Sequence, residues 1–193
     1  MKILLFIMIL TFNFQSLIKA DDIRDFKLEG FSIGDSLIDY YDELEVKNSK
    51  PLNYPNSDKF YQIAFIMNDA KYEAISFNLK KDDKKYIIHQ IKGLISYDNK
   101  IDECLKEKNK IVKSISSDLE IMKEDNYESY FNNTVGKSVA YVTDLLIENG
   151  GFGIWCTKWD KEHEKVKSTG WWDSLNVDIF TTEFKDFLAR EAY

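Results

Sequence analysis

The sequence has little proline, glycine, cysteine or histidine for its length of 193 residues. It contains 2 prolines, 8 glycines, 2 cysteines and 2 histidines. The glycines form no loop of the kind that holds a phosphate, and the cysteines form no paired zinc-binding pattern. The sequence therefore supports neither a nucleotide-binding loop nor a zinc domain, and we predict no cofactor.

An excess of basic residues is also missing. The chain has 26 lysines and arginines against 33 aspartates and glutamates. The first 20 residues hold two of the lysines and no acid, so the remainder carries a net charge of about −9. Such a balance opposes electrostatic binding to nucleic acid or to anionic lipid. We predict no nucleic-acid partner.

The N-terminus contains a sustained apolar run. Lys2 precedes an apolar run at residues 3–12 that is broken only by Thr11, and Ala20 ends the segment before two aspartates. A positive start, a short apolar middle and a small final residue are typical of a secretory signal peptide. We predict a signal peptide at residues 1–20 and a single mature domain at residues 21–193, located in the periplasm or secreted.

The alternative to a cleaved signal is a membrane anchor. Ile18 favours the anchor, because a signal peptide usually has a small residue at this position before the cut. The apolar run is nevertheless short for a hydrocarbon core about 30 Å thick. We expect cleavage, and no stable membrane insertion afterwards.

Both cysteines, Cys104 and Cys156, lie in the predicted mature chain. In an oxidising compartment they can form one disulfide bond. Two buried free thiols are the alternative, because an unpaired cysteine behaves as a small apolar residue. The sequence leaves both open.

Apolar periodicity and turn residues divide the mature chain into elements. We expect extended segments or strands at residues 23–33, 60–67, 72–79, 86–97, 138–147, 152–159 and 171–181. We expect helices at residues 36–44, 101–122 and 182–192. Residues 48–58, 124–134 and 160–170 are predicted loops. Ser36 resembles the start of a capping box, and Gly93 suggests a bulge in its strand.

Runs of strands separated by few helices favour an α+β fold. The order of elements predicts an antiparallel sheet with helices on one face. A helix followed by three strands occurs twice, which suggests two similar helix-plus-three-strand units.

Four tryptophans late in the chain are the candidate binding residues: Trp155, Trp159, Trp171 and Trp172. On a strand, Trp155 and Trp159 share one face, opposite Cys156, and the adjacent Trp171 and Trp172 point to opposite faces. At least one of this pair is then exposed or covered by a partner. Exposed tryptophan can anchor a protein interface or stack on a sugar ring. Core packing is the alternative.

Gly30, Ser32 and Gly34 match the G-x-S-x-G pattern of a hydrolase nucleophile elbow. That chemistry needs a strand before the serine, a helix at once after it, and a partner histidine. His89 lies in a predicted strand and His163 in a charged loop, with no supporting pattern around either. A bend that requires glycine is the simpler interpretation, so we assign no catalytic residue.

One acidic cluster contains a histidine. Asp160, Glu162, His163 and Glu164 are residue types that ligate metals, but their spacing matches no known ligand pattern. We predict a solvated turn there and no metal site.

The segment from Asp22 to Leu37, DIRDFKLEGFSIGDSL, resembles small exported proteins of AT-rich marine alphaproteobacteria. The resemblance extends through residues 91–94 and the helix containing Cys104, and it implies a Gram-negative envelope location without implying an activity. More distantly, this segment followed by a helix and a meander resembles envelope domains of the beta-lactamase-inhibitor and outer-membrane assembly lipoprotein type. Those domains often bind other proteins. The lipid-attachment cysteine of that type is missing here, so no membrane tether is implied.

These features together predict an exported, non-catalytic binding or interaction protein that uses its tryptophan-bearing face. Its expected partner is an envelope protein or a small ligand. A hydrolase using Ser32 and a small-ligand carrier with a pocket between sheet and helix are the alternatives.

Overall fold

The computed structural model describes residues 22–131 and 133–193. The predicted signal peptide lies outside these residues. The strands are β1 (Leu52–Asn53), β2 (Phe60–Ile66), β3 (Ala74–Lys80), β4 (Ile88–Asp98), β5 (Lys123–Tyr130), β6 (Val139–Ile147), β7 (Gly150–Lys158) and β8 (Asp173–Thr181). The helices are α1 (Glu43–Asn48), α2 (Ile101–Asp118), α3 (Glu164–Thr169) and α4 (Thr182–Arg190). No helix in the described ranges is long and apolar enough to cross a membrane.

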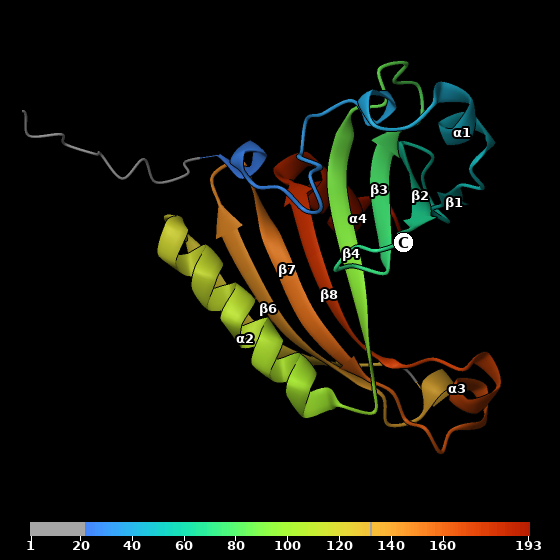
Figure 1. Cartoon of the computed structure of the whole chain (residues 1–193), viewed down its shortest axis with the longest axis vertical. Helices are drawn as coiled ribbons and strands as arrows, with labels where there is room; N and C mark the ends of the chain where they lie inside the picture. Colours follow the sequence, from blue (N-terminus) through green and yellow to red (C-terminus); the bar gives the residue numbers. More distant parts are fainter. Residues whose placement is uncertain (1–21, 132) are drawn as a thin grey trace, which may run out of the picture.

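The described strands form one antiparallel sheet in the order β1-β2-β3-β4-β8-β7-β6-β5 (Figure 1). The α+β class and the antiparallel sheet predicted from the sequence are therefore confirmed. Each half of the sheet is a meander of consecutive neighbours. The last strands of the two meanders, β4 and β8, pair with each other at the centre.

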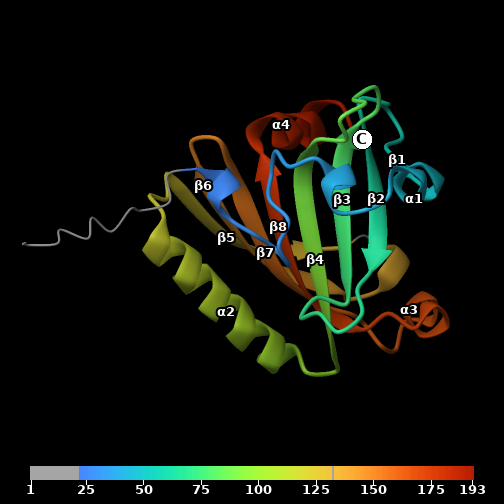
Figure 2. The ribbon, with the colours of Figure 1, turned by 45° about the horizontal axis from the view of Figure 1, so that its top comes forward.

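The main core lies on one face of the sheet. Alternate residues such as Phe77, Ile91, Ile154 and Val177 are buried there. The long helix α2 covers β4, β6, β7 and β8 on this face, and Figure 2 shows it lying along one side of the sheet. A disulfide bond joins Cys104 of α2 to Cys156 of β7.

The N-terminal segment covers the rest of the core face, which corrects the strand expected at residues 23–33. It forms a 3₁₀ helix at Ile23–Asp25 and a tight turn in which Leu28 bridges Phe31. Both of these apolar side chains are buried in the same core, whereas a strand would place positions three apart on opposite faces. Glu29 and Gly30 make the turn with positive φ angles of 51° and 91°.

The helix expected from residue 36 was also misplaced. Only a 3₁₀ turn, Leu37–Asp39, follows Ser36, because the Ser36 hydroxyl donates to the Lys85 carbonyl at 2.6 Å instead of capping a helix. The α-helix begins at Glu43, where the Asp42 carboxylate accepts a hydrogen bond from the Leu44 amide.

Two further expectations about the sheet were wrong. Residues 124–134 are not wholly a loop, because β5 pairs along its whole length with β6; its charged side chains are typical of an edge strand. The irregularities in β4 lie at His89 and Tyr97 rather than at Gly93, because the pairing with β3 skips His89 and the pairing with β8 skips Tyr97. Gly93 is regularly paired on both sides.

Helix α4 lies on the other face, which corrects the expectation of helices on one face only. It begins at the Thr181 hydroxyl, which accepts from the Phe184 amide. Phe184 and Phe187 pack on Phe60 of β2 and Phe180 of β8, whose side chains point away from the main core. This second, smaller core closes one end of that face.

Candidate functional site

The second face of the sheet is polar at its centre and yet buried. Its buried polar residues are Ser76, Asn78, Gln90, Thr157, Ser174, Asn176 and Asp178. A line of hydrogen bonds connects several of them. The Tyr54 hydroxyl donates to Asn78 at 2.8 Å, the Asn78 amide donates to Gln90, and the Gln90 amide donates to Asp178 Oδ2 at 2.7 Å.

The line of hydrogen bonds ends at a carboxylate oxygen without a partner. Asp178 is only 8% exposed, and its Oδ1 atom is buried with no hydrogen-bond partner in the described part of the chain. Leaving a buried polar atom unpaired is costly, and native structures contain few such atoms. The exception needs a physical reason, and the surroundings of Asp178 supply one.

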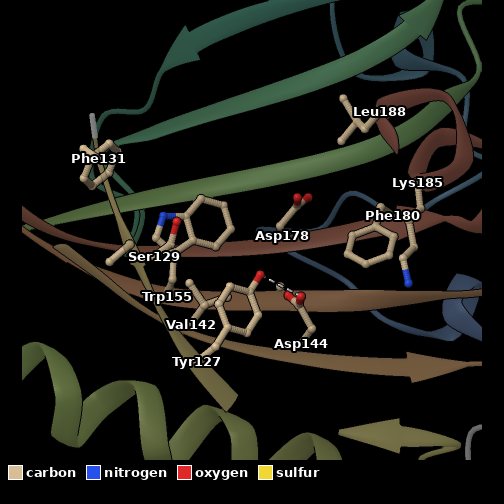
Figure 3. A pocket seen from close by; sticks show the side chains of 12 residues that line it. Tyr127, Ser129, Phe131, Val142, Asp144, Trp155, Asp178, Phe180, Lys185 and Leu188 are labelled. Atoms are coloured by element: carbon tan, nitrogen blue, oxygen red, sulfur yellow. Dashed lines mark hydrogen bonds between the residues drawn. The ribbon is translucent and has the colours of Figure 1, made fainter. Parts of the chain in front are cut away.

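Asp178 lines a pocket of about 390 Å³ between strands β5–β8 and α4. This volume is within the ~300–1,000 Å³ that small-molecule sites occupy. Aromatic rings form much of its wall, and Figure 3 shows Tyr127, Trp155 and Phe180 around the carboxylates of Asp144 and Asp178. The pocket therefore combines apolar walls with a few polar groups, as ligand sites usually do.

A glycine opens the floor of the pocket. Gly153 of β7 pairs with Asp144 of β6 on one side and with Asp178 of β8 on the other. The position that a Cβ atom would occupy on Gly153 is 3.4 Å from the Trp155 ring, 3.5 Å from Asp144 Oδ1 and 3.6 Å from Asp178 Cβ. The missing side chain therefore leaves a gap that two carboxyl groups and an indole ring border.

Burial changes the acidity of both carboxyl groups. Desolvation raises the pKa of Asp178 to about 7, although the hydrogen bond from Gln90 opposes the shift. Desolvation also raises the pKa of Asp144, against the opposing effects of the Tyr127 hydroxyl and the Lys185 charge. Tyr127 donates to Asp144 Oδ2 at 3.0 Å, and burial together with this neighbour raises its own pKa to about 12.

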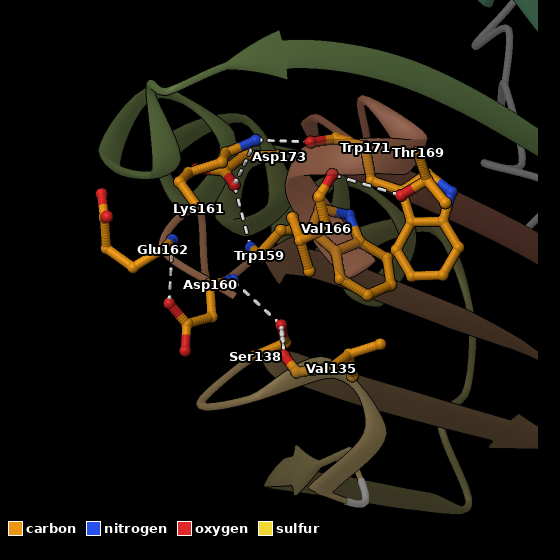
Figure 4. Close-up of polar contacts among 10 residues, drawn as sticks. All are labelled: Val135, Ser138, Trp159, Asp160, Lys161, Glu162, Val166, Thr169, Trp171 and Asp173. Carbon is orange, nitrogen blue, oxygen red and sulfur yellow. Dashed lines mark hydrogen bonds and ion pairs between the residues drawn. The ribbon is translucent and has the colours of Figure 1, made fainter. Parts of the chain in front are cut away.

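The four tryptophans that the sequence offers as candidate binding residues do not all lie on one surface. Trp155 lines the pocket, opposite the core-facing Cys156. Trp159 and Trp171 lie beyond the strand ends, where their ring centroids are 4.5 Å apart (Figure 4). Trp171 and Trp172 precede β8 rather than belonging to it, and they are 36% and 56% exposed.

One phenylalanine connects the pocket to the outer tryptophans. Phe131 lines the pocket, and its ring stacks on Trp159 at 5.0 Å. The backbone around this stack is held by polar contacts: the Trp159 amide donates to Asp173, and Lys161 donates to the Trp171 carbonyl (Figure 4). We call Phe131, Trp159, Trp171 and Trp172 the outer aromatic cluster.

The other motifs from the sequence do not form a site in the described residues. The Ser32 hydroxyl is buried without a hydrogen-bond partner there, and neither His89 nor His163 bonds to it. Asp160 accepts hydrogen bonds from the backbone amides of Lys137 and Glu162, which ties the acidic cluster into a turn. Among residues 22–131 and 133–193, no three histidine, cysteine or acidic side chains come together as a metal site requires.

Sequence reasoning missed Asp144, Gly153 and Asp178. Ser174, Asn176 and Asp178 alternate with apolar residues along β8, and such alternation usually means that the polar positions face water. The available sign that this face is covered was Phe180, a large apolar residue two positions after Asp178 on the same face of the strand.

Comparison with known proteins adds no assignment. No family model, no curated protein and no solved structure matches the chain. The function is therefore argued from the geometry of the pocket.

Proposed function

We propose that this protein is a non-catalytic binding protein that holds a small ligand in the pocket between β5–β8 and α4. The unpartnered Oδ1 atom of Asp178 is the observation that carries the proposal. Asp178 lines an aromatic-walled pocket, and an unpaired buried carboxylate oxygen is stabilised when a ligand supplies the missing hydrogen bond. The same atom makes no hydrogen bond within the part of the chain that the structure describes.

Gly153 supports this proposal independently. A Cβ there would make only ordinary contacts, at 3.4 to 3.6 Å, so the glycine is not required by crowding. The absence of a side chain at Gly153 leaves room between Asp144 and Asp178. Room at this position is what a ligand needs.

The test is a thermal-shift screen of small amines, sugars and carboxylates on the full mature protein. We expect at least one compound to raise the Tm of the wild type by several degrees. In Gly153→Val the added methyl groups fill the gap, so the shift disappears while the Tm without ligand stays close to that of Gly153→Ala. An undiminished shift in Gly153→Val would place binding elsewhere.

A protein-binding surface is the second candidate, and the outer aromatic cluster favours it. Trp171 and Trp172 expose large aromatic area side by side in the chain, and tryptophan is enriched among residues that dominate protein interfaces. Crosslinking in the native envelope, followed by affinity isolation, tests this. Capture of one partner in near-equal amount, lost in Trp171→Ala/Trp172→Ala, would support the surface over the pocket.

A hydrolase using Ser32 is the weakest of the three candidates. A nucleophile needs a base within hydrogen-bond reach and access to substrate. Ser32 is only 4% exposed, and its hydroxyl has no hydrogen-bond partner among the described residues. Unchanged esterase activity in Ser32→Ala, if any activity is found, would remove it.

We also propose that the protein works outside the cytoplasm and consists of two units. The predicted signal peptide and the Cys104–Cys156 disulfide support an oxidising compartment. N-terminal sequencing of the protein from the periplasmic fraction is expected to begin at residue 21. The pairing of β4 with β8 supports a division into two helix-plus-three-strand units, α1 with β2–β4 and α2 with β6–β8.

A further inference from the structure

The gap above Gly153 is bordered by hydrogen-bond acceptors. Asp144 Oδ1 lies 3.5 Å from the position of a Cβ on Gly153, and Asp178 Oδ1 is unpaired. The nearest donors are already used, because Gln90 donates to Asp178 Oδ2 and Tyr127 donates to Asp144 Oδ2. A ligand in this gap must therefore supply donors.

The one basic side chain of the pocket wall lies apart from this gap. Lys185 is on the exposed side of α4 and makes no ion pair with either carboxyl group. In Figure 3 its ammonium group points past the Phe180 ring, away from Asp178. Lys92 pairs with Asp178 across β4 and β8, and the charges of Lys92 and Lys185 oppose the rise that burial causes in the pKa values of Asp178 and Asp144. Neither lysine forms an ion pair with these carboxylates in the described part of the chain.

Aromatic rings adjoin the same gap. The Trp155 ring is 3.4 Å from the Gly153 Cβ position, and Tyr127 and Phe180 complete the wall. The face of an aromatic ring attracts a cation, and tryptophan does so most strongly. Carboxylates beneath aromatic faces are therefore suited to a positively charged group.

We propose that the pocket binds a protonated primary amine, with its ammonium group between Asp144 and Asp178 above Gly153 and its apolar body against Trp155. This inference rests on the proposed small-ligand function and names the class of ligand. A neutral polyol could donate hydrogen bonds to the same oxygens. It would add no positive charge beside two desolvated carboxylates, whose charge is costly in a buried site.

Binding of an ammonium group is coupled to the protonation of Asp178. The charged groups that face Asp178 are Lys92 and Asp144, with the Tyr54 hydroxyl at the far end of the hydrogen-bond line. Because the pKa of Asp178 is raised to about 7 without ligand, part of the protein carries a neutral carboxyl at neutral pH. The ammonium group favours the carboxylate, so the carboxyl proton leaves to solvent as the amine binds and the amine keeps its own proton. Affinity should rise with pH up to about 7 and then level off.

The experiment compares three probes that differ only in their polar group: 2-phenylethylamine, 2-phenylethanol and 3-phenylpropionate. Calorimetric titrations of the full mature protein at pH 5.5 and pH 8.0 measure each Kd. We expect the amine to bind most tightly, and about tenfold or more tightly at pH 8.0 than at pH 5.5. The alcohol should bind weakly and without pH dependence, and the carboxylate weakest.

Two matched variants identify the carboxyl group responsible. Asp178→Asn should weaken amine binding at pH 8.0 at least tenfold, abolish its pH dependence and leave the alcohol unchanged. Asp186→Asn removes an exposed charge on α4 outside the pocket and should change neither. Circular dichroism of both variants checks that they are folded.

The inference about charge and the proposed pocket fail in different ways. If the alcohol binds as tightly as the amine, or if Asp178→Asn binds the amine with unchanged affinity, the inference that the pocket binds an ammonium group is overturned. The proposed pocket still stands in that case, provided that Gly153→Val abolishes binding. If no probe binds and the screen finds only sugars or acids sensitive to Gly153→Val, the ligand class is wrong and the pocket is right. If no compound in the screen is sensitive to Gly153→Val, both are wrong.

Discussion

Asp178 is a buried carboxyl on a central strand, and its effect on stability depends on pH. Its pKa is raised to about 7 in the folded protein from a usual value of 3.8. The folded state therefore binds more protons than the unfolded state between pH 4 and pH 7. By linkage, this group lowers the free energy of unfolding progressively as the pH rises through that window.

Asp178→Asn should consequently stabilise the protein at pH 8 and have little effect at pH 4. The gain at pH 8 is at most about 4 kcal/mol, from roughly three pKa units at about 1.4 kcal/mol each. Urea denaturation at pH 4, 6 and 8 measures it, with Asp186→Asn as the exposed control. An equal change in the free energy of unfolding at pH 4 and pH 8 would show that ionisation of the Asp178 carboxyl does not destabilise the folded state.

Gly93 is a glycine that the fold requires. The Tyr72 ring lies over it, and a Cβ at residue 93 would be 2.4 Å from Tyr72 Cδ1 and 2.8 Å from its Cγ. Gly93→Ala should therefore lower the free energy of unfolding by about 1–3 kcal/mol, the usual cost of overpacking. Equilibrium denaturation measures the loss.

Two comparisons isolate the cause of that loss. In a Tyr72→Leu background the ring is gone, so Gly93→Ala should cost clearly less than it does in the wild type. Gly153→Ala, whose Cβ has ordinary contact distances, should cost less than about 1 kcal/mol. If Gly93→Ala lowers the free energy of unfolding equally in the wild type and in Tyr72→Leu, the loss comes from the backbone at residue 93 rather than from a clash with Tyr72.

At the scale of elements, the disulfide fastens α2 to the sheet. Cys104 and Cys156 are 52 residues apart in sequence, and both are fully buried in the main core. Closing a loop of that length stabilises by about 4 kcal/mol in the chain-entropy model. The double variant Cys104→Ala/Cys156→Ala should lose an amount of this order in denaturant titration.

Reduction provides an independent measurement of the same contribution. A thiol reductant should lower the stability of the wild type towards that of the double variant and leave the double variant unchanged. A double variant as stable as the oxidised wild type would mean that packing alone holds α2 in place.

Helix α4 depends on the aromatic cluster beneath it. Phe187 is fully buried, and its ring centroid lies 5.0 Å from that of Tyr54 and 4.9 Å from that of Phe60. Phe187→Ala should cost about 3–5 kcal/mol, the usual loss for a buried phenylalanine. Because α4 forms one wall of the pocket, any ligand-induced Tm shift should shrink as well.

The control for Phe187→Ala is its neighbour in the chain. Asp186→Ala alters an exposed position of α4 and should change the free energy of unfolding by less than about 0.5 kcal/mol. A similar loss in both variants would show that helix propensity, not the core contact, determines how α4 is held.

At the scale of the whole molecule, the two meanders share one core. Strands β4 and β8 pair over eight positions, and the Gln90–Asp178 hydrogen bond crosses the same junction. The N-terminal segment adds a second link, because Phe26 packs on Phe152 of β7 while Phe31 packs on Phe77 of β3. We expect the halves to unfold together.

The distribution of tryptophan allows this to be tested without labels. All four tryptophans lie in the second half of the chain, so their fluorescence reports that half alone. Far-ultraviolet circular dichroism reports both halves. Coincident denaturation midpoints are expected for one cooperative unit, and two separate midpoints would show that the meanders are independent.

The strands that the sequence predicted well are those with strong local patterns. Strands β2, β3, β4, β6, β7 and β8 were predicted from apolar positions that recur along the chain, as in a pleated strand with one apolar face. The long helix α2 follows its period of 3.6 residues in the same way. The N-terminal segment and β5 were missed, because their conformations depend on a partner: the core under Phe31, and the free edge of β6.

The candidate site was predicted only in part. Trp155 was identified as a candidate from its residue type, and it lines the pocket. Trp171 and Trp172 were placed on a strand that begins after them. Asp144 and Asp178 were not singled out, since a polar residue at alternate strand positions gives the same pattern whether water or another element covers it.

The sequence by itself determined the class of the fold, most strands and the position of α2. The spacing of apolar and polar residues along the chain is a local property, and it matches the period of the strand or helix that those residues form. Only the tertiary structure decided that α4 lies on the polar face, next to the pocket that Asp178 lines. That outcome depends on contacts of Phe180 and Phe187 with Phe60, which is far from both in the chain. Burial of the Asp178 carboxyl, and hence its raised pKa, follows from such contacts and not from the alternation of residues along β8.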